Sequence, residues 1–175
     1  MAREYGDIAD LAVRSMQIMA TGEPSDFEKL IHPEAVNREG ATEPPACRGL
    51  GPDAFYATAL WLRQAFADLA WDVHTVVTEG DTVVAHTTMS GRQIGPFVAY
   101  DAEGAVAQAF PATGNRFAIT QTHWIRVVDG MVVEHWANRD DLGMSVQLGW
   151  NPPTPRYLLR MRRATKQARR AEAAG

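Results

Sequence analysis

The hydrophobic period of this chain changes once, close to residue 70. Apolar residues recur at helical spacing over 8–19 and over 55–69, so each stretch predicts an amphipathic helix. From Trp71 onward apolar and polar residues alternate, which is typical of strands with one buried face. A chain that places helices first and antiparallel strands afterwards is expected to form an α+β fold, with the helices on one face of a curved sheet.

Local signals divide the chain further. Ser25 and Glu28 fit a capping box for a short helix between the two long ones, giving three N-terminal helices. Asp129-Gly130 is a turn dipeptide, and it predicts a closing hairpin with strands near 117–128 and 131–139. Helices packed in a curved sheet make a cone-shaped barrel, and a cone has an interior in which a ligand can bind.

Several classes of protein are excluded by simple features. No apolar run approaches the roughly 20 residues that a membrane-spanning helix needs. The N-terminus lacks the pattern of a secretory signal peptide, so a cytoplasmic location is expected. Cys47 is the only cysteine, which excludes an intrachain disulfide and a cysteine-built metal site. Neither metal-ligand spacing nor a glycine-rich nucleotide motif occurs, so we expect no metal and no cofactor.

Charge is distributed unevenly along the chain. Residues 156–175 carry seven basic side chains against Glu172, a net charge of +6, which leaves −10 on residues 1–155. Pro152-Pro153-Thr154-Pro155 precedes the basic segment, so we expect a domain over 1–150 and a proline linker with a basic tail over 151–175. An acidic domain repels phosphate backbones, which argues against nucleic-acid binding. The tail is expected to contact the domain through Tyr157–Met161 and to pair beyond that with its acidic surface.

The closing hairpin is the part of the chain with the clearest candidate site. A two-residue turn at Asp129-Gly130 pairs Val128 with Met131, and cross-strand partners share a face. In this register the inner face collects polar and aromatic side chains, an arrangement that is typical of a ligand pocket: Gln121, His123, Glu134, Trp136, Asn138 and Asp140. The outer face carries Trp124 and His135, and it predicts a surface for homodimerisation.

Asp140 is the leading candidate for an acid or base, because a carboxylate that points into an apolar cone loses hydration and its pKa rises. The alternative is that Asp140 caps a short final helix beginning at Asp141. His123 is the second catalytic candidate, or else a histidine satisfied in the core. His86 is a weaker pocket candidate on a neighbouring strand, expected to share a face with Val73.

Five segments of the chain, taken in order, resemble one family. They include "LIHPEAVNREG" at 30–40, "PATGNRFAITQTHWIRVVDG" at 111–130 and "VVDGMVVEHWANRDDLGMSVQLGW" at 127–150. Together they are similar to SnoaL-like polyketide cyclases, or ester cyclases, of the nuclear transport factor 2-like superfamily. The resemblance implies a cone-shaped α+β barrel with a deep pocket, usually a homodimer.

The resemblance also implies roles for individual residues. In these cyclases an Asp on the last strand is the acid and base of an intramolecular aldol closure, with a Gln and a His on the preceding strand. Carried over by position, these are Asp140, Gln121 and His123, and Asn37 is a further pocket residue. A shift of one or two positions would align Asn138 or Asp141 in place of Asp140.

These features predict a cofactor-independent acid/base enzyme that acts on a hydrophobic carbonyl compound, with aldol cyclisation as the leading reaction. The same groups would serve an isomerase, a dehydratase or a hydrolase. A binding protein without turnover, and a module that uses its sheet for assembly, are the alternatives from other classes.

Overall fold

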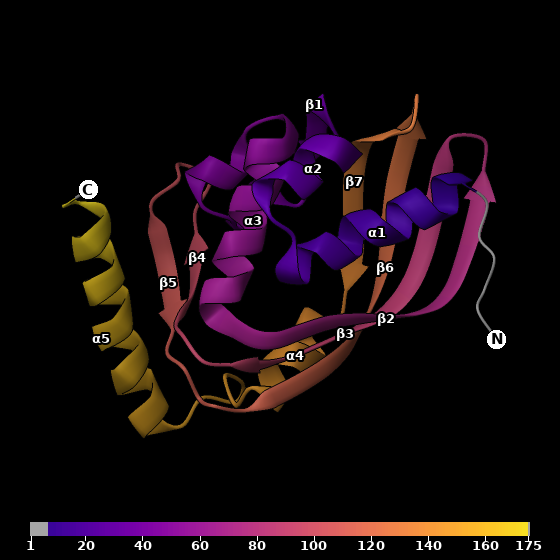
Figure 1. The fold of residues 1–175 in the computed structure, drawn as a ribbon. Coiled ribbons are helices and arrows are strands. Elements are labelled where there is room, and N and C mark those ends of the chain that lie inside the picture. Colours follow the sequence, from indigo (N-terminus) through magenta and orange to yellow (C-terminus); the bar gives the residue numbers. More distant parts are fainter. Residues whose placement is uncertain (1–6, 175) are drawn as a thin grey trace.

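The computed structural model describes residues 7–174, and its helical half covers one face of a curved sheet (Figure 1). Three helices lie at the start of the described chain, as the period predicts: α1 (Asp7–Thr21), α2 (Pro24–Leu30) and α3 (Gly51–Ala65). The capping box of α2 is formed by Glu23 and Asp26, two residues earlier than the pair that the sequence predicts. Helix α3 ends sooner than predicted, because Phe66 already begins the first long strand.

The main sheet has five strands in the order β1-β7-β6-β3-β2. Strand β1 runs parallel to β7, and the other pairs are antiparallel. The predicted α+β barrel with a curved mixed sheet is therefore confirmed. Its strands are β1 (Ile31–Asn37), β2 (Phe66–Glu79), β3 (Thr82–Gln93), β6 (Arg116–Val128) and β7 (Met131–Arg139).

Smaller elements outside the main sheet contribute to the lining of the interior. Strands β4 (Phe97–Tyr100) and β5 (Val106–Phe110) form a separate antiparallel pair, and α4 (Asp141–Gln147) follows β7 directly. Between α2 and α3 lie β1 and two short 3-10 turns, Gly40–Thr42 and Pro45–Arg48. No described helix is long and apolar enough to cross a membrane.

The basic tail forms helix α5 (Pro155–Glu172), which lies along β5 at the edge of the molecule (Figure 1). Tyr157 is buried, as expected. Farther along, the Thr165 hydroxyl accepts from the backbone of Ala109, and Arg169 donates to the Val106 carbonyl. Within residues 7–174 no ion pair joins an arginine or lysine of α5 to a carboxylate, and α5 contacts the domain through these hydrogen bonds and the buried Tyr157. The pairing of this segment with an acidic surface stays a prediction.

A bulge in the hairpin of β6 and β7 changes which side chains face inward. Val128 pairs with Met131 at the turn, as predicted, but Arg126 pairs with Glu134. Val133 is therefore an extra residue in β7, and every later residue of that strand is displaced by one position. Because side chains alternate along a strand, this displacement exchanges the two faces of β7. The predicted inner face of β7 is wrong from this point on.

The exchange moves predicted pocket residues out and brings others in. Trp136 pairs with Trp124 on the outer face, and Asn138 pairs there with Thr122. His135, predicted to lie outside at a dimer surface, lies inside next to His123.

A second bulge explains the position of His86. Val73 pairs with Thr87, but Thr75 pairs with His86, so His74 is the extra residue in β2. His86 is exposed on the outer face of the sheet, where its Nδ1 lies 3.2 Å from the Thr122 hydroxyl. The prediction that His86 lines the pocket is therefore wrong.

The core consists of two clusters. One packs α1, α2 and α3 on the turn end of the sheet and is mainly aliphatic, with Phe27 and Ile31 among its fully buried members. The other is rich in aromatic residues and joins the start of β2 to α4, with Phe66 and Trp150 as large members. Both clusters contribute to the lining of one cavity, so the cavity lies where they meet.

Candidate active site

A cavity of about 370 Å³ occupies the interior of the cone. It receives side chains from helices α1, α3 and α4 and from both sheets, and most of its lining is apolar or aromatic. Cavities of this size hold drug-sized ligands. The apolar lining includes Met16, Met19, Phe55, Trp61, Leu62, Phe66, Trp71, Met89, Phe97, Phe110, Val132, Met144 and Trp150.

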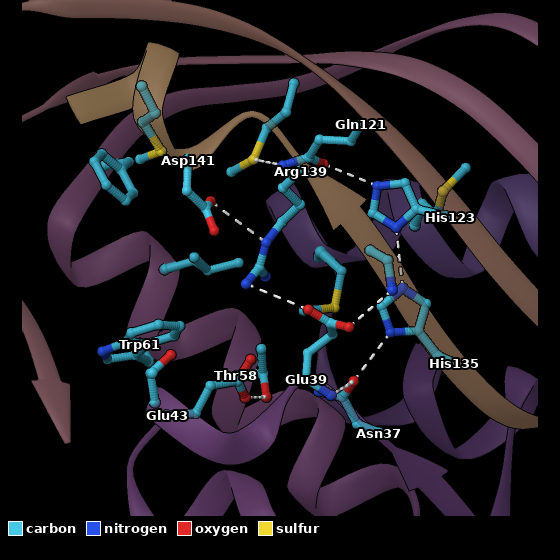
Figure 2. Close-up of a pocket in the computed structure, with 18 of the residues that line it drawn as sticks. Asn37, Glu39, Glu43, Thr58, Trp61, Gln121, His123, His135, Arg139 and Asp141 are labelled. Carbon is cyan, nitrogen blue, oxygen red and sulfur yellow. Dashed lines mark hydrogen bonds and ion pairs between the residues drawn. The ribbon is translucent and has the colours of Figure 1, made fainter. Parts of the chain in front are cut away.

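Two histidines from neighbouring strands form the centre of the polar lining (Figure 2). Nδ1 of His123 lies 3.0 Å from Nε2 of His135, and the ring centroids are 5.3 Å apart. Nε2 of His123 lies 2.8 Å from Oε1 of Gln121, and Nδ1 of His135 lies 3.0 Å from Oδ1 of Asn37. The four side chains therefore make one continuous hydrogen-bonded row along the sheet.

Burial keeps both rings uncharged. Desolvation, the largest cause, and the positive charge of Arg139 together lower the pKa of His123 to about 4. Desolvation also lowers the pKa of His135 to about 3, with smaller effects of His123 and Arg139. Near neutral pH both imidazoles are therefore available as bases.

A carboxyl group faces the cavity from another side. Glu43, from the loop before α3, is only 3% exposed, and the Thr58 hydroxyl donates to its Oε2 at 2.7 Å. Burial raises the pKa of Glu43 above its usual range, although the Thr58 hydrogen bond opposes this shift. In Figure 2, Glu43 and Thr58 lie across the close-up from His123 and His135.

Arg139 carries the positive charge of the cavity lining, and two acidic groups hold it. Its Nη2 lies 3.3 Å from Oε2 of Glu39, and its Nε lies 3.5 Å from Oδ1 of Asp141. Glu39 is itself anchored, because its Oε1 accepts from the backbone N–H of Ala137 at 2.8 Å. The guanidinium group is thus fixed beside the cavity, where it can stabilise negative charge on a bound molecule.

The structure brings together only some of the predicted site residues. Gln121, His123 and Asn37 line the cavity, and so does Asp141. Asp140 does not, because its Oδ1 accepts from the backbone N–H of Gly143 at 2.8 Å and caps α4. The capping alternative is therefore the one that the structure bears out for Asp140.

Four ionisable residues of the lining were not singled out as pocket residues by the sequence: His135, Arg139, Glu39 and Glu43. The first two depend on the bulge, and the sequence carries a weak signal for it. Met131, Val132 and Val133 are three apolar residues in succession, which breaks the alternation of a regular strand. The two glutamates lie in a segment where no periodic pattern predicts their direction.

The comparisons with known proteins agree with this architecture. The family model described as SnoaL-like polyketide cyclase matches residues 9–148, which is most of the chain. The chain belongs to this family. The resemblance and the kind of enzyme expected from the sequence are therefore confirmed.

Named members of the SnoaL-like family are similar along most of their length. Aklanonic acid methyl ester cyclase DnrD from Streptomyces peucetius is 36% identical over 147 residues, which cover 83% of this chain and 93% of that protein. Nogalonic acid methyl ester cyclase from Streptomyces nogalater is 31% identical over 134 residues, 74% of this chain and 87% of that protein.

Solved structures show the same SnoaL-like fold. TsrD from Streptomyces laurentii superposes with a TM-score of 0.65 at 27% identity, covering 85% of this chain and 98% of TsrD. IdmH from Streptomyces antibioticus has a TM-score of 0.59 at 23% identity, covering 81% and 98% of the two chains. The comparison with IdmH concerns the fold alone.

Proposed function

We propose that this SnoaL-like enzyme closes a ring by intramolecular aldol addition in a hydrophobic, polyketide-derived carbonyl compound. Two relatives over 30% identical are cyclases of aklanonic and nogalonic acid methyl esters, which supports this class of substrate. The observation that carries the proposal is the content of the cavity. Neutral imidazoles and a carboxyl group of raised pKa face one apolar space.

His123 is the proposed base. A carbon flanked by two carbonyl groups has an acidic C–H bond, and Nε2 of His123 takes this proton as the C–H electron pair becomes an enolate. The enolate carbon then attacks a second carbonyl of the same molecule, so a carbon–carbon bond forms and the carbonyl oxygen becomes an alkoxide. Arg139, which lines the same cavity, stabilises the negative charge on the oxygens.

Glu43 is the proposed acid. Its raised pKa favours the protonated carboxyl, which gives its proton to the new alkoxide. The proton on His123 returns to Glu43 through solvent after the product leaves, so the substrate and product are isomers. No redox step occurs, and the proposal requires no cofactor.

Turnover of the two methyl esters named for the relatives tests this proposal. We expect ring closure with aklanonic or nogalonic acid methyl ester, followed as a change in chromatographic retention at constant mass. The substitution His123→Gln should lower kcat by ~10²–10⁴-fold, the usual contribution of a positioned base. Binding, measured by quenching of tryptophan fluorescence from Trp61 or Trp71, should persist.

Two results would overturn the proposal. If both esters bind without turnover, the chain acts on them as a binding protein. If His123→Gln retains full activity, the base lies elsewhere.

We also propose that two copies assemble through the outer face of the sheet and that the enzyme acts in the cytoplasm. The stacked rings of Trp124 and Trp136, 5.9 Å apart, lie on this face, and Val77 on the same sheet is 59% exposed. Light scattering should give a dimeric mass, reduced to that of a monomer by Trp136→Glu. A monomeric wild-type protein would contradict the assembly, and recovery in a membrane or secreted fraction would contradict the location.

A further inference from the structure

We propose that Asn37, His135, His123 and Gln121 form a relay that holds one proton more than two neutral imidazoles carry, with His135 as the positioning residue. The inference deepens the proposed function, because it says how His123 is held in the form that acts as the base. It follows from counting the hydrogens that the row of contacts requires.

The row ends at a side-chain amide oxygen on each side. A neighbouring group that can only donate a hydrogen bond fixes the orientation of each oxygen. The backbone N–H of Glu39 donates to Oδ1 of Asn37 at 3.3 Å. The indole N–H of Trp71 donates to Oε1 of Gln121 at 3.1 Å. A backbone N–H and an indole N–H cannot accept, so the atoms that face the two histidines are acceptors at both ends.

Three contacts connect these two acceptors through four ring nitrogens. They are His135 Nδ1 to Asn37 Oδ1, His135 Nε2 to His123 Nδ1, and His123 Nε2 to Gln121 Oε1. Each contact needs one hydrogen, because two lone pairs repel at about 3 Å. Two neutral imidazoles supply two hydrogens, and one imidazolium with one imidazole supplies three. The row is therefore complete only with a single extra proton, and it has no place for a second.

The neutral row leaves one contact without a hydrogen, and we assign that contact to His123 Nε2, the nitrogen that is the proposed base. Gln121 Oε1 loses least, because it keeps the shorter of the two anchoring hydrogen bonds. The open position for an added proton is then His123 Nε2, so the proton is taken up on the His123 ring. His135 Nδ1 then donates to Asn37, and His123 Nδ1 donates to His135.

In this arrangement the lone pair of His123 Nε2 faces Gln121 Oε1 with no hydrogen between them, and a proton taken from the substrate fills that position. Once Nε2 carries that proton it donates to Gln121 Oε1 at 2.8 Å, and the row is complete. His135 acts through His123 by accepting the Nδ1 hydrogen, much as the third member of a catalytic triad fixes the tautomer of its histidine.

The charged groups around His123 and His135 determine how readily the two rings take up the extra proton. Arg139 disfavours it, and Glu39 and Asp141 offset that effect because both pair with Arg139. Glu43 stands in the same cavity with a raised pKa. Helix α1 contributes Ser15, Met16 and Met19, and α3 contributes Phe55, which carry no charge.

Nitrogen-15 NMR of the imidazole rings, recorded without substrate, tests the relay directly. In the wild-type protein at pH 7 we expect His123 to carry its hydrogen on Nδ1 and His135 to carry its hydrogen on Nδ1. On acidification, the pair should take up one proton, on His123, while the protein stays folded. A His123 hydrogen on Nε2 at pH 7, or uptake of two protons together, would overturn the proposal.

The variant His135→Phe keeps an aromatic ring and removes both nitrogens. We expect the His123 hydrogen to leave Nδ1 for Nε2, with kcat lowered at least 10-fold and KM nearly unchanged. His135→Gln, whose amide oxygen can accept from His123 Nδ1, should recover part of kcat and of the tautomer. His86→Phe, on the outer face, is the matched control and should change neither.

A second variant tests the relay if His135→Phe does not fold. Asn37→Asp keeps the acceptor oxygen and adds a negative charge at the far end, so the extra proton should bind more tightly. The rising limb of kcat against pH should then move to higher pH, and an unmoved limb would contradict the relay. Should the NMR result hold while His123→Gln keeps its activity, the relay stands and the proposed reaction fails.

Discussion

The hairpin of β6 and β7 carries two stacked pairs of rings, one pair on each face of the sheet. On the inner face, His123 and His135 lie with centroids 5.3 Å apart, and every ring nitrogen has a polar neighbour within 3.0 Å. On the outer face, Trp124 and Trp136 stack at 5.9 Å, and the Trp124 indole N–H has no hydrogen-bond partner within the described chain. The ring nitrogens of the inner pair all have polar contacts, whereas the outer pair packs through the faces of its rings.

The difference shows how little separates a catalytic pair from a packing pair. Trp124 follows His123 directly in β6. Trp136 follows His135 directly in β7, so each strand places one ring on each face of the sheet. The extra residue Val133 decides this assignment. Four changes test the comparison, from the one that exchanges the pairs to one that leaves both in place.

Inserting an alanine after Val133 should have the largest effect. With Val133 still in the bulge, the alanine would take the place of Glu134 opposite Arg126, which would turn Trp136 inward and His135 outward. A large indole and the Glu134 carboxylate would face the core without partners, so we expect a loss of about 4 kcal/mol or more, measured by urea unfolding.

The control for this insertion is Val133→Ala, which keeps the number of residues in β7 and should cost about 1 kcal/mol. An insertion variant with the stability and activity of the wild type would show that the number of residues in β7 does not set the faces.

Replacing Glu43 by Gln tests whether the inner face needs an acid in addition to its bases. The amide keeps the size of the side chain but cannot supply the proton, so kcat should fall about 100-fold. Stability should be unchanged or slightly higher, because a buried ionisable group is removed. Glu103→Gln, an exposed neutralisation of the same kind, should leave kcat intact. Full activity of Glu43→Gln would remove Glu43 from the mechanism.

Lowering the pH should weaken the fold through the inner pair. Unfolded histidines titrate near pKa 6.5, whereas burial lowers the pKa of His123 to about 4 and of His135 to about 3. The unfolded chain therefore binds more protons below pH 6.5, and the stability present above that pH is lost as the pH falls toward 4. Between pH 7 and 5 we expect a loss of about 2 kcal/mol per histidine, from urea unfolding.

The control for the pH experiment is His86→Gln on the outer face, which should leave the slope unchanged. If the free energy of unfolding did not change between pH 7 and pH 5, His123 and His135 would have the same pKa in the folded and unfolded chain.

Substituting Asp140 should have the smallest effect, since its side chain caps α4 and does not line the cavity. Asp140→Ala should cost about 1 kcal/mol, and Asp140→Asn, a comparable cap, should restore most of it. Both variants should keep kcat/KM within about twofold of the wild type. A large loss of turnover in Asp140→Asn would instead make Asp140 catalytic, as the family resemblance alone implies.

Local patterns predicted most of the elements and part of the site. The predicted strands 117–128 and 131–139 agree closely with β6 and β7, because alternation and a turn dipeptide are properties of neighbouring residues. Gln121 and His123 were placed correctly on the inner face, since β6 is regular along its length.

The rest of the site depends on contacts between distant segments. Asn37 contacts His135 because β1 pairs with β7 in parallel, and no local sequence pattern predicts that pairing. Glu43 is buried because its loop packs on α3, where the Thr58 hydroxyl donates a hydrogen bond to its carboxyl group. These positions follow from how the segments pack, and the residues on either side of each one do not encode them.

By itself the sequence determined the family, the change from helices to strands, the turn at Asp129-Gly130 and the inner residues of β6. Only the tertiary structure decided the faces of β7 and with them the exchange of Asp140 for His135 at the candidate site. The physical reason is the two-residue period of a strand, in which one extra residue sends every later side chain to the other face. Whether a strand accommodates that residue is settled by the strands and helices packed against it.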